Sequence, residues 1–161
     1  MEIRNAAVAD IPQIMQIFSE AREYMASSGN PDQWSENYPA QSMIEADIRR
    51  QTSFVCVENS AILATFYFAI ETEPTYATIQ GNWLNNNPYG VIHRIARVSD
   101  NAAKNVGALV FNWCFEQIHN IRIDTHRDNK TMIDLLDRLG YTYCGIIHIA
   151  TGAERLAFQK I

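Results

Sequence analysis

The sequence is short of the features that mark special classes of protein. Its 161 residues include seven glycines, five prolines and three cysteines, without a low-complexity tract or an internal repeat. That composition excludes a collagen-like chain and a disulfide scaffold, and 47% hydrophobic residues suits an ordinary globular protein. The length fits one domain, so we expect residues 1–161 to form a single domain.

Long apolar runs, which mark membrane-spanning and secreted proteins, are also missing. No stretch approaches the ~20 apolar residues of a membrane helix, and no apolar signal segment opens the chain. Cys56, Cys114 and Cys144 lie far apart in apolar surroundings, a pattern that indicates buried, reduced thiols. We therefore expect a cytoplasmic protein with no membrane partner.

Positive charge is scarce. Lys and Arg number 13 against 18 Asp and Glu, a net charge of −5, and the densest basic pair is Arg49–Arg50. Nucleic-acid-binding proteins usually carry a basic stripe, so we expect no nucleic-acid partner, whereas an acidic surface tolerates a cationic amine. No two histidines or cysteines show metal-ligand spacing, and we expect no metal.

What the sequence does contain is an alternation of strand-like and helix-like segments. Alternating or β-branched stretches predict strands at residues 2–5, 54–57, 62–70, 91–98, 121–125, 141–149 and 155–161. Apolar residues at helical spacing predict helices at residues 10–27, 40–50, 103–117 and 128–139. Asp10 and Asp128 are the expected N-caps, Gln13 would complete a capping box, and Gly140 ends the last helix. Residues 71–89 form a polar insert with several aromatics.

The strand–helix–strand order in the second half predicts one parallel pair with a right-handed crossover. The hairpin-like segments predict antiparallel pairing elsewhere, so the sheet is mixed.

The stretch 91–140 resembles the two sequence blocks of the GNAT superfamily of N-acetyltransferases, and the element order extends this resemblance over essentially the whole chain. The first block is a strand, a loop of the form Q/R-x-x-G-x-G/A and a long helix, here from Val91 to Leu109. The second is Asn-x-x-Ala-x-x-Leu-Tyr-x-x-x-Gly-Phe, here from Asn129 to Tyr141. The sequence departs from the family's Gln/Arg, Gly, Ala and Tyr at Ala102, Asn105, Met132 and Leu136.

The resemblance implies a fold and a cosubstrate. The fold would be the α/β (α+β mixed) acyl-CoA N-acyltransferase fold, a central, mostly antiparallel seven-stranded sheet with a splayed parallel pair, flanked by four helices. The cosubstrate would be acetyl-CoA, its pyrophosphate held by free amides where a loop of small side chains enters a helix. The expected coenzyme contacts are Ile95, Ala96, Arg97, Val98, Ala103, Lys104, Asn105, Val106, Gly107, Ala108, Asn129 and Met132. From the residues alone, the loop fits an ordinary capped helix better than a coenzyme site, and Asn129 fits a helix cap as well as a coenzyme contact.

Acetyl transfer by direct attack requires a base, a stabilised oxyanion and a protonated thiol. His93 is the first candidate for the base because an imidazole ordinarily titrates near pH ~6.5, and the alternative is a histidine hydrogen-bonded within the sheet. His126, at the carboxyl end of a strand, is a second candidate, with a strand-end polar cluster as its alternative. Leu136 replaces the usual Tyr, so Tyr143 or solvent water would protonate the thiolate.

Four aromatic residues on or beside loops would line the acceptor site, namely Tyr24, Trp34, Tyr38 and Trp83. They suit a small-molecule or peptide amine, in part by cation–π contact, and their alternative is a hydrophobic cluster under long loops. Dimers are common among similar enzymes, so a homodimer is one expected assembly. Two other functions stay open: a coenzyme- or ligand-sensing module without turnover, and an interaction domain with an exposed strand edge.

Overall fold

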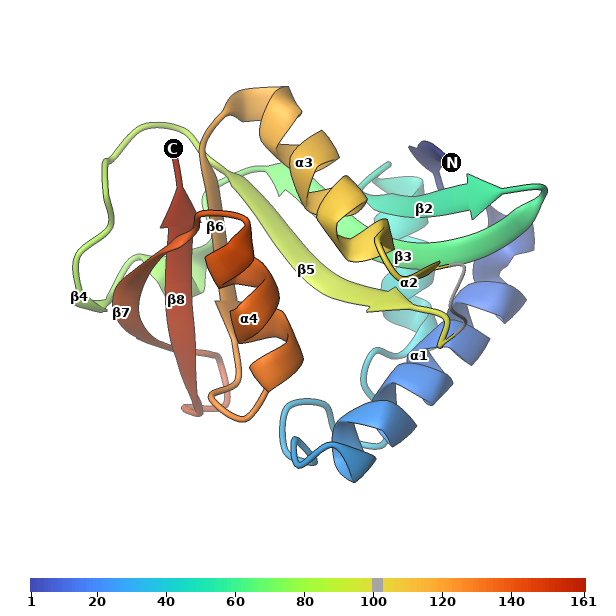
Figure 1. Ribbon diagram of the computed structural model, residues 1–161, viewed down its shortest axis with the longest axis horizontal. Coiled ribbons are helices and arrows are strands. Elements are labelled where there is room, and N and C mark those ends of the chain that lie inside the picture. The colour runs from blue at the N-terminus through green and yellow to red at the C-terminus, as the bar shows by residue number, and fades with distance from the viewer. Residues whose placement is uncertain (100–102) are drawn as a thin grey trace.

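The computed structural model describes residues 1–99 and 103–161, and Figure 1 shows a twisted mixed sheet with helices packed on it. Within this part of the chain the sheet has eight strands in the order β1-β2-β3-β5-β6-β8-β7-β4. The strands are β1 Glu2–Asn5, β2 Ser53–Glu58, β3 Ala61–Ile70, β4 Gln80–Gly81, β5 Gly90–Arg97, β6 Ile121–Thr125, β7 Thr142–His148 and β8 Glu154–Lys160. Neighbouring strands are antiparallel except for β5 and β6, which are parallel. The predicted fold class is confirmed.

The α-helices of the described residues are α1 Ile11–Ser27, α2 Gln41–Arg49, α3 Val106–Ile118 and α4 Lys130–Arg138. None of them is long and apolar enough to cross a bilayer. Alternation along the strands gives the sheet two apolar faces. One face packs on α3 and α4 through Phe66, Phe111 and Leu136, and the other packs on α1 and α2 through Val55.

Only one of the two predicted helix caps lies at the predicted position. Asp10 is the N-cap residue of α1, but its side chain makes no capping hydrogen bond, because its carboxylate accepts the Ala7 N–H at 2.8 Å and pairs with Arg4 at 2.7 Å. These bonds close a short 3-10 turn, Val8–Asp10, that leads into α1 without a side-chain cap. At α4 the cap is Asn129 rather than Asp128, since Asn129 Oδ1 accepts the Met132 N–H at 3.1 Å.

The insert between β3 and β5 contains two short elements that the sequence pattern does not predict. Residues Pro74–Tyr76 form a 3-10 helix, and Gln80–Gly81 form β4, which adds an eighth, edge strand beside β7. Gly81 and Gly145 stand opposite each other in this pair, both with positive φ. A Cβ at Gly145 would overlap the carbonyl oxygen of Gln80, so the two backbones approach this closely only because both positions are glycine.

We predict that Gly145→Ala lowers the free energy of unfolding by at least ~2 kcal/mol, because the methyl group overlaps backbone that cannot move without breaking the β4–β7 pair. Urea unfolding followed by circular dichroism measures the change. Gly152→Ala is the matched control, since Gly152 also has positive φ but no atom lies within 4 Å of its Cβ position. Equal losses in the two variants would contradict a specific clash at β4.

Candidate active site

The site begins where the parallel pair separates. Strands β5 and β6 pair only at Gly90↔Ile121 and Val91↔Arg122. Beyond these residues β5 continues along β3 and β6 continues along β8. Among the described residues, the edge of β5 from Ile92 onward therefore has no strand partner on the β6 side, and Figure 1 shows the two strands diverging there.

A bulge changes the direction of β5 beside this opening. The register with β3 shifts between Thr65 and Tyr67, and Arg94 adopts a left-handed φ of 51°. The extra residue places two consecutive side chains against the same neighbour, because both His93 and Arg94 lie over the ring of Tyr67. Arg94 is fixed in this conformation by Asp47 of α2, which it contacts at 2.6 Å.

A pocket of about 230 Å³ adjoins the separated end of β5. Its walls come from the carboxyl half of β5, the second half of α1 and the first turns of α3 and α4. Seven of the predicted coenzyme contacts line it, namely Ile95, Ala96, Arg97, Val98, Gly107, Asn129 and Met132. With Ala64 and Leu135 these residues make a largely apolar channel beside an unpaired strand edge. We call it the coenzyme pocket, after the coenzyme contacts that the sequence predicts among its lining residues.

The other predicted coenzyme contacts do not line this pocket. Ala103 and Val106 are buried in the core, Lys104 and Asn105 are exposed, and Ala108 is half-buried. Asn105 is the N-cap of α3 but makes no capping hydrogen bond with its side chain. Ala102, the expected position of the family's Gln/Arg, lies outside the described residues.

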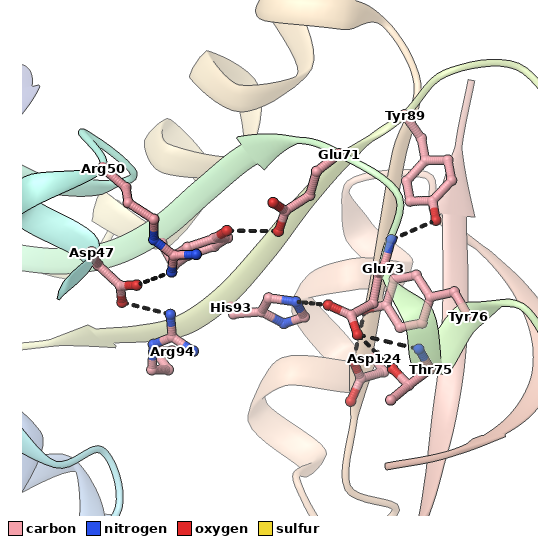
Figure 2. A network of polar contacts seen from close by, with 11 residues as sticks. Asp47, Arg50, Glu71, Glu73, Thr75, Tyr76, Tyr89, His93, Arg94 and Asp124 are labelled. Atoms are coloured by element: carbon pink, nitrogen blue, oxygen red, sulfur yellow. Dashed lines mark hydrogen bonds and ion pairs between the residues drawn. The ribbon is translucent and has the colours of Figure 1, made fainter. Parts of the chain in front are cut away.

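The three catalytic candidates are not brought together. His93 Nε2 lies 3.2 Å from Glu73 Oε2 (Figure 2). His126, just after β6, accepts the Asp128 N–H at 3.2 Å through Nδ1. Tyr143 is 53% exposed, packs edge-on against Phe158 and lines neither the coenzyme pocket nor the second hollow described below. Leu136, where the family has Tyr, is fully buried.

Sequence reasoning missed Glu73, the polar partner of His93. The backbone fixes this carboxylate, since Oε1 accepts the Thr75 N–H at 3.2 Å and the Thr75 hydroxyl at 3.0 Å. The Glu73 N–H in turn donates to the Tyr89 hydroxyl at 3.0 Å. The hydrogen bond from His93, reinforced by Thr75, lowers the pKa of Glu73 from 4.5 to about 2 despite partial burial. A local signal in the sequence could have indicated this turn, since Glu73-Pro74-Thr75 has an acidic cap followed by proline at the start of a helical turn.

Two further polar contacts surround His93 (Figure 2). The Tyr67 hydroxyl donates to Glu71 at 2.6 Å, and the Tyr76 hydroxyl donates to Asp124 at 2.7 Å. Burial, followed by the neighbouring carboxylates, raises the pKa of both tyrosines, so each stays a neutral donor. The ring centroids of Tyr67 and Tyr76 lie 5.6 and 6.3 Å from that of His93, so both rings pack beside the imidazole.

The predicted acceptor aromatics lie in three separate places. Tyr24 lines the coenzyme pocket and shares a hydrogen bond of 2.9 Å with Thr131 across it. Trp34 and Tyr38 pack on each other with ring centroids 5.9 Å apart. Trp83 lines a second hollow, of about 540 Å³, together with Glu73. The sequence placed all four near loops, but only the tertiary structure separates them.

Comparison with known proteins identifies the family. An acetyltransferase of the GNAT family from Streptococcus agalactiae is 34% identical, with a TM-score of 0.87, over 99% of this chain and 94% of that one. A GNAT-family acetyltransferase from Listeria monocytogenes is 18% identical, with a TM-score of 0.70, over 99% and 93% of the two chains. A ribosomal-protein-alanine N-acetyltransferase from Brucella melitensis is 15% identical, with a TM-score of 0.66, over 100% and 99%.

No protein-family model matches the sequence, and no curated protein matches it. The structural matches suffice: the chain belongs to the GNAT family of acetyltransferases. The two matches at 18% and 15% identity support the shared fold alone. Membership of the GNAT family supports acyl transfer as the general activity.

We predict that Glu73→Gln destabilises the protein at pH 7 and loses this effect in acid. Because folding lowers the pKa of Glu73 from 4.5 to about 2, its carboxylate contributes stability that is fully present above the unfolded pKa. That contribution, on the order of 3 kcal/mol, disappears as the pH falls through about 2. Urea unfolding of both proteins from pH 7 to pH 2 measures it. A stability difference independent of pH would contradict the ionic origin.

Proposed function

We propose that the protein is an N-acetyltransferase that moves the acetyl group of acetyl-CoA to a primary amine of a small molecule or peptide by direct attack. The observation that carries the proposal is the short pairing of β5 with β6, which leaves a strand edge unpaired beside an apolar pocket. A thioester carried on an amide-bearing arm suits such a place, because the arm can pair with the strand while its apolar atoms leave water.

The residues present fit two parts of acetyl-CoA, its pantetheine arm and its pyrophosphate. The backbones of Ile95 and Arg97 would pair with the pantetheine arm along the open edge of β5. The Val98 N–H, also predicted to pair with the arm, instead donates to the Leu63 carbonyl at 2.9 Å on the β3 side. The first turn of α3 would hold the pyrophosphate through its amides, with Lys104 exposed beside it. Ala103 and Val106 would contribute backbone amides only, since both side chains lie in the core. A Cβ at Gly107 would come within 3.1 Å of the Leu135 side chain, so glycine lets α3 pack closely on α4 at this wall.

His93 would remove the proton from the acceptor's ammonium group, which must be neutral to attack. It stands two residues before Ile95, on the strand that lines the coenzyme pocket. Backbone N–H groups of β5 next to the bulge would stabilise the oxyanion. Tyr143 lies on β7 away from the pocket lining, so we assign protonation of the thiolate to solvent water.

The coenzyme pocket gives the first test of this function. Ala21→Trp, on the pocket-facing side of α1, would fill the channel and weaken acetyl-CoA binding at least ~tenfold, or ~1.4 kcal/mol. Ala26→Trp is the matched control on the same helix, because Ala26 is exposed and does not line the pocket. Calorimetric titration with acetyl-CoA measures both. No heat with the wild-type protein, or equal weakening in both variants, would overturn the proposed site.

The base gives the second test. His93→Gln should lower kcat/KM for acetyl transfer to an amine by ~10²- to 10⁴-fold and leave acetyl-CoA affinity unchanged. His148→Gln, whose side chain is 43% exposed at the end of β7, should leave both unchanged. A thiol-release assay across a panel of primary amines gives the rates. Binding of acetyl-CoA with no turnover of any amine would instead favour a sensing module.

A further inference from the structure

The contacts of His93 define which of its two ring nitrogens is free to act. Nε2 faces Glu73 Oε2 at 3.2 Å. Among the described residues, no side chain or backbone group makes a hydrogen bond with Nδ1. A neutral imidazole has one N–H donor and one lone-pair acceptor, and the partner of one nitrogen decides the role of the other.

Glu73 settles this role because it is an acceptor without a proton. Its Oε1 accepts two hydrogen bonds from Thr75, at 3.2 and 3.0 Å, and its pKa lies below the ordinary 4.5, so it is a carboxylate throughout the neutral range. A carboxylate offers only lone pairs, so the nitrogen bonded to it must be the donor. In the neutral ring Nε2 therefore carries the hydrogen, and the lone pair is on Nδ1.

Contacts within the insert between β3 and β5 fix the Glu73 carboxylate beside His93 Nε2. Thr75 bonds Oε1 twice, the Tyr89 hydroxyl accepts the Glu73 N–H, and Pro74 restricts the backbone between them. Glu73 is 18% exposed and His93 is 23% exposed, so solvent weakens their contact less than at an open surface.

The other charged or titratable groups near the ring have partners of their own. Tyr67 of β3 donates to Glu71, Tyr76 of the insert donates to Asp124 of β6, and Arg94 of β5 pairs with Asp47 of α2. Glu73 is therefore the group among the described residues whose charge acts directly on His93.

We propose that Glu73 is a positioning residue that holds His93 with its proton on Nε2, so that Nδ1 is the atom that takes the proton from the acceptor amine. This inference rests on the proposed function. An N–H bond of the acceptor's ammonium breaks, the electron pair stays on the amine, and the proton forms an Nδ1–H bond. The resulting imidazolium is balanced by the Glu73 carboxylate and then releases the proton to water.

The tautomer is tested on the wild-type protein without any assay of activity. Long-range nitrogen–proton NMR spectra at a pH where the ring is neutral distinguish a protonated from an unprotonated ring nitrogen. We expect Nε2 protonated and Nδ1 unprotonated, with the His93 signals assigned by their loss in His93→Gln. The reverse tautomer would overturn the proposal even if the protein is an active acetyltransferase.

The functional role is tested with Glu73→Gln and its neighbour Glu71→Gln. Glutamine at 73 can still accept the Nε2 hydrogen but has no charge, so the acid limb of kcat/KM should move to lower pH by ~1 unit. The affinity for acetyl-CoA should not change. Glu71→Gln is the matched control, because Glu71 is exposed and bonds Tyr67 rather than His93. An unmoved limb in Glu73→Gln, or an equal shift in Glu71→Gln, would contradict the role.

Discussion

Strands β5 and β6 share only two residue pairs before they separate, and the site depends on that early separation. At the junction the strands approach closely because Gly90 has no side chain. A Cβ there would come within 2.7 Å of the Phe68 ring and 2.8 Å of the Ile121 side chain. Beyond the junction each strand stays paired with its other neighbour, so the edge of β5 opens without unfolding either half of the sheet.

The part of β5 beyond the junction has lost its β6 partner, and a buried ion pair between Asp47 and Arg94 holds it in position. Asp47 is 4% exposed and Arg94 is 11% exposed, and they meet at 2.6 Å between α2 and the bulge. Such a pair adds little net stability, since desolvation offsets much of its attraction, but removing one partner leaves a charge stranded. The ion pair links α2 to Arg94, the left-handed residue of the bulge, and so holds the bulge that places His93 and Arg94 against Tyr67. The coenzyme pocket is lined mainly by apolar side chains, whereas His93 is held by a polar contact with Glu73.

Periodicity in the sequence was enough to predict the order of the main elements, because α3, α4 and β5 carry clear apolar patterns. It failed at β4, whose two residues are too short for any pattern and pair only because Gly81 meets Gly145. The capping signal placed Asp10 correctly at the N-cap of α1 but did not predict that its carboxylate would bond Arg4 and the Ala7 amide instead of the helix. Local signals rank capping residues but do not include such partners.

The family blocks predicted Ile95–Val98, Gly107, Asn129 and Met132. All of them line one pocket, because they lie at the carboxyl end of β5 and at the starts of α3 and α4. Glu73 and Asp47 could not be found this way, because each reaches its partner from 20 and 47 residues away. The sequence could not predict where the four aromatic side chains lie, because no spacing rule relates them. They lie in different parts of the structure, namely Tyr24, the pair Trp34 and Tyr38, and Trp83.

The most direct test of the account is hydrogen exchange of the backbone amides with and without acetyl-CoA. If the open edge of β5 and the start of α3 hold the coenzyme, amides from Ile92 to Arg97 and from Val106 to Ala108 should exchange more slowly when it is present. Amides of β4 and of the Trp83 hollow should be unaffected. Unchanged exchange along β5, or slowing confined to the Trp83 hollow, would contradict the claim that the separated strands form the coenzyme site.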